Sequence, residues 1–83
     1  MATTSVTLNT AWQQIGIGPV TGLNVSTGQT DLCRLWVDST APAASEEGIV
    51  VNPVDFRNFD LEDASEILYA RADKADVEIK VSS

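Results

Sequence analysis

The sequence predicts an all-β protein, a small antiparallel β-sandwich or barrel of about seven strands. Three observations lead to this expectation: short segments rich in β-branched and aromatic residues recur, turn-forming residues separate them, and apolar and polar residues alternate within them. Many short strands divided by turns are typical of sandwiches and barrels. With 83 residues, the chain is expected to form a single domain over residues 1–83.

The expected strands follow one another at short intervals. They are SVTLNTAW (5–12), VTGLNVS (20–26), DLCRLWVD (31–38), IVV (49–51), VDFRNFDL (54–61), residues 66–72, and a C-terminal strand from residue 77. Glycine and proline interrupt regular pairing, so IGIGP (15–19) is expected to form a bend or bulge. TGQT (27–30) is expected to form a turn centred on Gly28. STAPAASEEG (39–48) is expected to be a loop.

Residues 61–72 also fit a helix in part. Asp60 is a suitable helix cap, and Leu61, Ala64 and Leu68 fall on one helical stripe. We expect a strand over residues 66–72 because β-branched and aromatic residues there directly precede a strictly alternating final strand. A hairpin through ADKAD (72–76) would join the two strands without a long crossover.

Alternation within the expected strands predicts the core. Every second residue of a strand points to the same face, and folding buries the apolar face. The side chains expected in the core are Leu8, Leu23, Cys33, Leu35, Val37, Ile79 and Val81. The chain has one cysteine and no histidine, so neither an internal disulfide nor a zinc site is expected to staple this small core. Small domains of this kind often gain burial from other subunits.

Two expected strands have apolar residues on both faces. In the strand over 31–38, Leu32 and Trp36 lie opposite the expected core face. In the strand over 66–72, Tyr69 lies on one face while Leu68 lies on the other. Large apolar side chains need cover, so Leu32, Trp36 and Tyr69 are the expected interface residues. We expect a homo-oligomer, with a trimer favoured, although an interior place in the sandwich would also cover a two-faced strand.

Composition argues against several kinds of partner. The net charge is −7, from 12 acids against 5 bases, and the pI is about 4.1. Such a surface repels nucleic acid and anionic membranes, so neither is an expected partner. No apolar run approaches the roughly 20 residues that span a bilayer. The N-terminal residues lack the basic start and apolar core of a secretion signal, which predicts synthesis in the cytoplasm.

Enzymatic chemistry is not expected. Without histidine, nucleophile systems that use a histidine base cannot form. Cys33 has apolar neighbours, and burial makes a thiol unreactive. The spacing of Gly16, Gly18 and Gly22 does not match a dinucleotide-binding loop. The acids at 60, 62, 63 and 66 do not match a calcium-binding EF-hand loop. We therefore expect no catalytic residue, no metal site and no cofactor.

Three stretches of the chain combine short structural motifs. The first has a tryptophan before a Gly-x-Gly-Pro turn, in AWQQIGIGPV (11–20). The second has a strand, an Ala-Pro loop and a glycine, in LCRLWVDSTAPAASEEGIVV (32–51). The third has an aromatic-Ala-Arg-Ala strand before the C-terminal strand, in ILYARADKADVEIKVSS (67–83). The residues concerned are Trp12, Gly16, Gly18, Pro19, Ala41, Pro42, Gly48, Tyr69, Ala70, Arg71 and Ala72. This combination resembles small bacteriophage virion structural proteins, of the head-decoration or tail-associated β-sandwich type.

The resemblance implies a non-enzymatic virion component on the capsid surface or in the tail. Its partners would be other copies of itself and other virion proteins, and it would reach the virion after synthesis in the host cytoplasm. One alternative is a small carbohydrate-binding module for host attachment, with Trp12, Trp36 or Tyr69 stacking on sugars. Another is an inhibitor whose acidic surface mimics nucleic acid, which requires acids gathered on one face.

Overall fold

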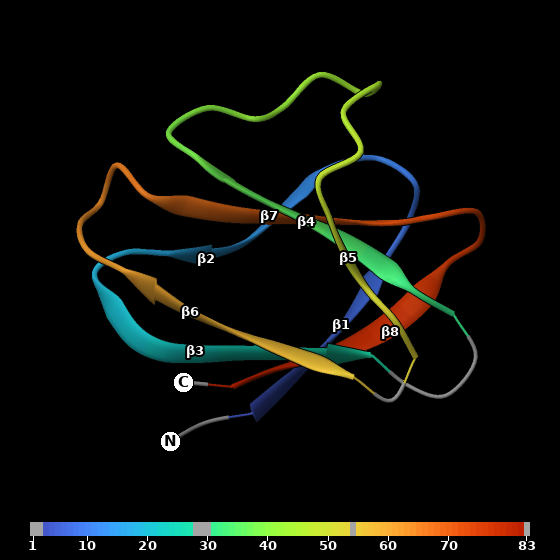
Figure 1. Ribbon diagram of the computed structural model, residues 1–83, viewed down its shortest axis with the longest axis horizontal. Helices are drawn as coiled ribbons and strands as arrows, with labels where there is room; N and C mark the ends of the chain where they lie inside the picture. Colours follow the sequence, from blue (N-terminus) through green and yellow to red (C-terminus); the bar gives the residue numbers. More distant parts are fainter. Residues whose placement is uncertain (1–2, 28–30, 54, 83) are drawn as a thin grey trace.

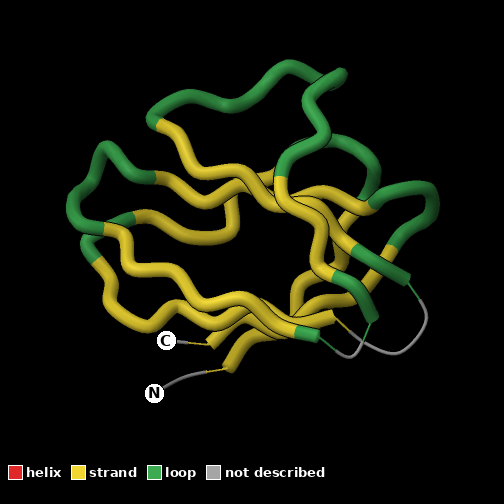
Figure 2. Tube along the Cα trace, in the orientation of Figure 1, coloured by secondary structure: helices red, strands yellow, loops and turns green. Residues whose placement is uncertain are grey.

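The computed structural model describes residues 3–27, 31–53 and 55–82. These residues form eight strands and no helix, so the expected all-β class is confirmed (Figures 1 and 2). The strands are β1 (Thr3–Leu8), β2 (Gln13–Ile17), β3 (Val20–Thr27), β4 (Cys33–Asp38), β5 (Ile49–Val51), β6 (Phe56–Leu61), β7 (Ile67–Ala72) and β8 (Val77–Ser82). The expected TGQT turn falls largely on residues 28–30, outside the described ranges.

Two four-stranded antiparallel sheets form the sandwich. Sheet A has the strand order β1-β8-β3-β6, and sheet B has the order β2-β7-β4-β5. Consecutive strands alternate between the sheets several times, so the core joins residues far apart in the chain. In Figure 1, β3 and β6 lie below β2, β4 and β7, and the loop over residues 39–48 arches above β4 and β7.

The core lies between the two sheets, as the alternation predicts. Six of the seven expected core residues are buried: Leu8, Leu23, Cys33, Leu35, Ile79 and Val81. Val37 packs against this core but is only partly buried, because it lies near the end of β4. The closing strand β8 buries Val77, Ile79 and Val81 and exposes the residues between them, which is the period-two pattern of a half-buried strand.

The structure has one strand more than expected, because the segment expected at 5–12 stops at Leu8. A turn follows, in which Asn9 Oδ1 accepts a hydrogen bond of 2.8 Å from the Ala11 N–H. The glycine-containing segment then forms β2, with a register shift between Gln14 and Gly16 against β7. The bend expected there is therefore a bulge within a strand. An edge strand tolerates it because only one neighbour must be paired.

The helical alternative for residues 61–72 is wrong. β7 begins at Ile67 and pairs with both β2 and β4, and Leu68 and Ala70 are fully buried in the core. The acidic residues before it form a short turn, closed by a 3.1 Å hydrogen bond from the Glu66 N–H to the Asp63 carbonyl. Two-sided pairing and two-sided burial explain why both faces of β7 are apolar.

Candidate interaction surfaces

The outer face of sheet B carries the side chains that the sequence predicts as an interface. Trp36 on β4 is directly opposite Tyr69 on β7 in the strand register. Tyr69 is only 8% exposed in the single chain. Trp36 and Leu32 are partly buried, and Leu32 lies just before β4. The structure therefore brings Trp36 and Tyr69 together, while contact of these residues with a partner stays a prediction.

Trp12 and the 39–48 loop lie against this outer face. The rings of Trp12 and Trp36 are tilted at 60° with centroids 6.4 Å apart. The Trp12 indole N–H donates a 3.2 Å hydrogen bond to the Ala43 carbonyl in the loop. The second apolar face of β4 and β7 thus obtains much of its cover from the same chain.

Two arginines of sheet B hold the loop from below. Arg71 on β7 donates a 3.1 Å hydrogen bond to the Glu46 carbonyl, and Arg34 on β4 donates one of 3.3 Å to the Glu47 carbonyl. Arg34 also pairs with the Asp73 carboxylate at 2.8 Å. Hydrogen bonds from charged donors are stronger than neutral ones, so these contacts fix the loop on the sheet.

A hollow remains beside this cover, at the edge of sheet B. Its volume is about 390 Å³, and it is lined by Leu35, Trp36, Val37, Gly48 and Ile49. The Trp36 indole nitrogen is buried and makes no hydrogen bond within the described residues. The Trp36 ring is therefore held by packing, whereas Trp12 is held by packing and a hydrogen bond.

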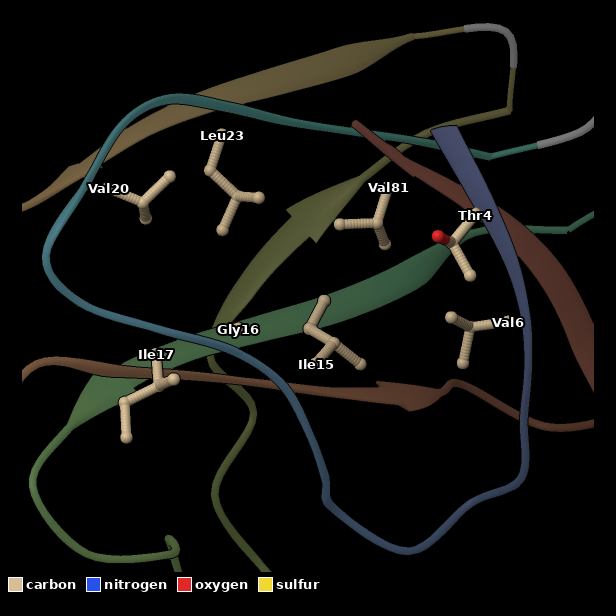
Figure 3. A pocket seen from close by; sticks show the side chains of 8 residues that line it. All are labelled: Thr4, Val6, Ile15, Gly16, Ile17, Val20, Leu23 and Val81. Atoms are coloured by element: carbon tan, nitrogen blue, oxygen red, sulfur yellow. The ribbon is translucent and has the colours of Figure 1, made fainter. Parts of the chain in front are cut away.

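An apolar pocket lies between β2 and sheet A (Figure 3). Its volume is about 300 Å³, and its lining is Thr4, Val6, Ile15, Gly16, Ile17, Val20, Leu23 and Val81. Gly16 makes the close approach of the sheets possible here, because a Cβ at this position would lie 2.8 Å from Leu23 Cδ2. With no charged residue in its lining, this pocket suits an apolar side chain.

The outer face of sheet A is polar except for Phe56 on the edge strand β6, in contrast to sheet B. One row crosses all four strands in register and consists of Thr3, Ser82, Asn24 and Asn58. The Asn24 amide donates a 2.8 Å hydrogen bond to the Asn58 side-chain oxygen. In the next row, Lys80 lies between Ser5 and Ser26 and donates to the Ser5 hydroxyl. Hydrated side chains of this kind need no protein cover.

The acids of residues 60–66 bind backbone N–H groups of their own turn and of strand β3. Asp63 accepts hydrogen bonds from the Ser65 hydroxyl and from the Ser65 N–H. These bonds, the hydroxyl first, hold the pKa of the Asp63 carboxyl below its usual value. Glu66 Oε1 accepts from the Glu62 N–H at 2.7 Å, and Asp60 accepts from the Gly22 N–H at 2.8 Å. Asp63 and Glu66 therefore cap the turn before β7, whereas Asp60 connects strands β6 and β3.

The described part of the chain contains neither a cluster of metal ligands nor an accessible thiol. No group of three or more His, Cys, Asp and Glu side chains lies close enough there to hold a metal ion. Cys33 is fully buried in the core, and this burial raises the pKa of its thiol to about 11. No helix of the described residues is long and apolar enough to cross a membrane.

Comparison with known proteins gives no relative. No protein-family model matches the chain, no curated protein matches it, and no solved structure matches it.

Sequence reasoning missed two features of these surfaces. The sequence predicts only a loop over residues 39–48, whereas in the structure these residues cover an apolar sheet face. Sequence reasoning also missed the pocket beside β1 and β2. The sequence does contain one signal for this uncharged pocket. Residues 1–30, which supply most of its lining, contain no charged side chain, and all 17 charged side chains lie in residues 31–83.

Proposed function

We propose that this protein is a non-enzymatic structural component of a bacteriophage virion. It assembles through protein–protein contacts on the capsid surface or in the tail. The resemblance of its motifs to small virion proteins supports the class, and the β-sandwich fold agrees with it. The mode of action is supported by the placement of apolar side chains that the fold leaves uncovered.

The observation that carries the proposal is the position of the exposed large apolar residues. Ile17, Ile49 and Phe56 are 50%, 43% and 56% exposed, respectively. Each lies on a strand at a sheet edge, namely β2, β5 or β6. Single exposed apolar residues are common on proteins. Here they are distributed over three edge strands of the sandwich, which supports contact with neighbouring subunits through these edges.

The carbohydrate-binding alternative draws less support from the structure. A sugar platform needs an open aromatic ring next to polar groups that point outward. The Trp12 ring instead contacts Arg71 and Trp36, and its indole N–H is used by Ala43. Tyr69 is buried. The nucleic-acid-mimic alternative needs free acids gathered on one face, yet Asp63 and Glu66 cap a turn and Asp60 binds the backbone of β3.

The test is the composition of purified phage particles. Mass spectrometry of particles from the phage that encodes the chain is expected to find it in a fixed ratio to the major capsid or tail protein. Purified protein should also rebind particles that lack it. Its absence from particles, together with failure to rebind, would refute the proposal.

Rebinding also tests the role of the exposed apolar edge residues. Phe56→Ser is expected to weaken rebinding, because it removes an exposed apolar contact without touching the core. Asn58→Ala is the matched control, since Asn58 lies on the same outer face of the same strand. Glycan-dependent retention of the protein on host cells, with no particle binding, would support the carbohydrate-binding alternative instead.

A further inference from the structure

The edges of a β-sheet need protection, because their free N–H and C=O groups pair readily with another strand. Within the described residues the sandwich has four edges, at β1, β6, β2 and β5. Proteins commonly protect edges with charges, bulges or very short strands. The four edges here differ in this respect.

Three edges carry such protection. β5 has only three residues. β2 contains a register shift next to Gly16. β6 carries Arg57 and Asp60. Arg57 lies opposite Val25, on the inner face of this edge strand, and is exposed to solvent. An inward-pointing charge on an edge disfavours further pairing, because an added strand would bury it.

The fourth edge, β1, carries none of these devices. It pairs with β8 through six consecutive residues without a register shift. Its sequence, TTSVTL, contains no charge, glycine or proline. In an antiparallel pair the backbone groups of alternate residues point away from the neighbour. About half of the β1 backbone groups are therefore directed at solvent along an uncharged edge without a bulge.

We propose that β1 pairs antiparallel with β1 of a second copy of this chain, about a two-fold axis at Ser5. Sheet A and its copy then form one continuous eight-stranded sheet. The inference rests on the proposed function for its purpose, since assembly by protein–protein contacts is what the pairing serves. An isologous contact of this kind uses the same strand on both subunits and closes on itself.

The residues of β1 are self-complementary in this register. On the outer face, Ser5 lies opposite Ser5 and Thr3 lies opposite Thr7. On the inner face, Thr4 lies opposite Val6. These small or β-branched side chains suit directly opposed positions in a sheet. The added Thr4 and Val6 also continue the inner face beside the apolar pocket, whose wall already contains Thr4 and Val6 of the first copy.

The local charge permits a second copy to occupy this edge, despite the net charge of −7. The charged side chains directly opposite β1 in the register are Glu78 and Lys80 on β8, and these two pair with each other at 3.2 Å. Glu78 lies opposite Thr7 and Lys80 lies opposite Ser5, so the surroundings of the axis are close to neutral. The acids of the turn before β8 lie beyond the Leu8 end of β1, away from the axis at Ser5. Salt screens charges beyond about 8 Å at physiological ionic strength.

The first test measures mass against concentration by analytical ultracentrifugation of the purified chain. Ser5→Glu and Ser5→Lys each place like charges face to face at the axis, which should raise the dimer dissociation constant about tenfold or more. A one-to-one mixture of the two variants should regain a dimer, because opposite charges then meet. Ser26→Glu and Ser26→Lys are matched controls. Ser26 lies next to Lys80 as Ser5 does, but it is on the interior strand β3 and so lies away from the proposed axis.

The second test detects the pairing itself. Directly opposed residues have Cα atoms about 4.5–5.5 Å apart, within the range that a disulfide spans. Ser5→Cys should form a disulfide-linked dimer under mild oxidation, whereas Ser26→Cys should not. Cys33 does not compete because it is buried with a raised pKa.

Several results would overturn the pairing. In ultracentrifugation, these results are a monomer at all concentrations, a trimeric mass, or dissociation by the Ser26 variants as strong as by the Ser5 variants. A mixture of Ser5→Glu and Ser5→Lys that does not reassociate would have the same meaning. In the oxidation test, it is the absence of a Ser5→Cys dimer. Pairing of β1 with a different protein would appear as the first of these. None of these results bears on whether the chain is found in particles, so the two proposals fail separately.

Discussion

Arg71 lies over the ring of Trp12, with its guanidinium carbon 5.2 Å from the ring centroid. The contact joins β7 to the turn before β2. The same guanidinium donates to the Glu46 carbonyl, so one side chain connects a strand, a turn and the loop over residues 39–48. A cation over a tryptophan face is worth about 0.5–2 kcal/mol, depending on its hydration.

Replacing Arg71 with alanine should therefore loosen the loop and destabilise the fold. We expect the free energy of unfolding in urea to fall by about 1–3 kcal/mol, from the loss of the ring contact and one or two hydrogen bonds. Limited proteolysis should cut residues 39–48 faster. Lys74→Ala is the control, because it removes an equal charge from an exposed position. Identical behaviour of the two variants would show that the arginine does not hold the loop.

Gly48 and Gly22 form a natural pair for a second test. Their φ angles are +69° and +72°, a region that costs other residues about 1–2 kcal/mol. A Cβ at Gly22 would meet nothing within 4 Å, whereas a Cβ at Gly48 would lie 2.4 Å from the Leu35 carbonyl oxygen. Gly48→Ala should therefore cost about 1–3 kcal/mol more than Gly22→Ala in urea unfolding. Equal losses would contradict the close approach.

The fold class and most of the core follow from local alternation. Leu35 and Ile79 occupy alternating positions in short segments, and period-two burial depends only on which face of the strand meets the other sheet. The same reasoning placed Trp36 correctly on the opposite face of β4. Local pattern suffices where one geometric rule decides burial.

The cover over Trp36 and the status of β1 could not be derived in this way. The bond between Trp12 and Ala43 joins residues 31 positions apart, and no periodic pattern encodes it. β1 is an edge strand because β8, the last strand, pairs with it and with β3. Likewise, Gln13–Ile17 forms a strand despite Gly16 because β7 provides a neighbour. These features depend on the order of strands in the sheets, which is set by the whole chain.

The ion pair between Arg34 and Asp73 should contribute measurably to stability. Its side chains are only 19% and 21% exposed, and it connects β4 with the turn after β7. Partial burial reduces screening by water, so Asp73→Asn is expected to cost about 1–2 kcal/mol in urea unfolding. The pair of Lys80 and Glu78 is 51% and 60% exposed. Glu78→Gln should therefore change stability by less than about 0.5 kcal/mol. The reverse order of these two losses would contradict the argument.

The thiol of Cys33 should be unreactive toward thiol reagents in the folded protein. It is fully buried, and desolvation raises its pKa from 9.0 to about 11. A thiol reagent at pH 8 is therefore expected to label the chain only in denaturant, because the thiolate is the reactive form. Prompt labelling of the folded chain, at the rate of the unfolded one, would show that Cys33 is accessible. Chelators should leave the fold and any assembly unchanged.

The same raised pKa predicts how stability depends on pH. The folded state holds the Cys33 proton more tightly than the unfolded state, so unfolding releases it between pH 9 and about 11. The contribution to stability is therefore complete below about pH 9 and declines as the pH rises through about 11, by about 2–3 kcal/mol in all. Cys33→Ala removes this term, while every other titrating group is common to both proteins. The difference in unfolding free energy between wild type and Cys33→Ala should be constant from pH 6 to about 8.5 and then shrink toward pH 11. A difference that stays constant across the whole range would mean that the thiol titrates alike in the folded and unfolded chains.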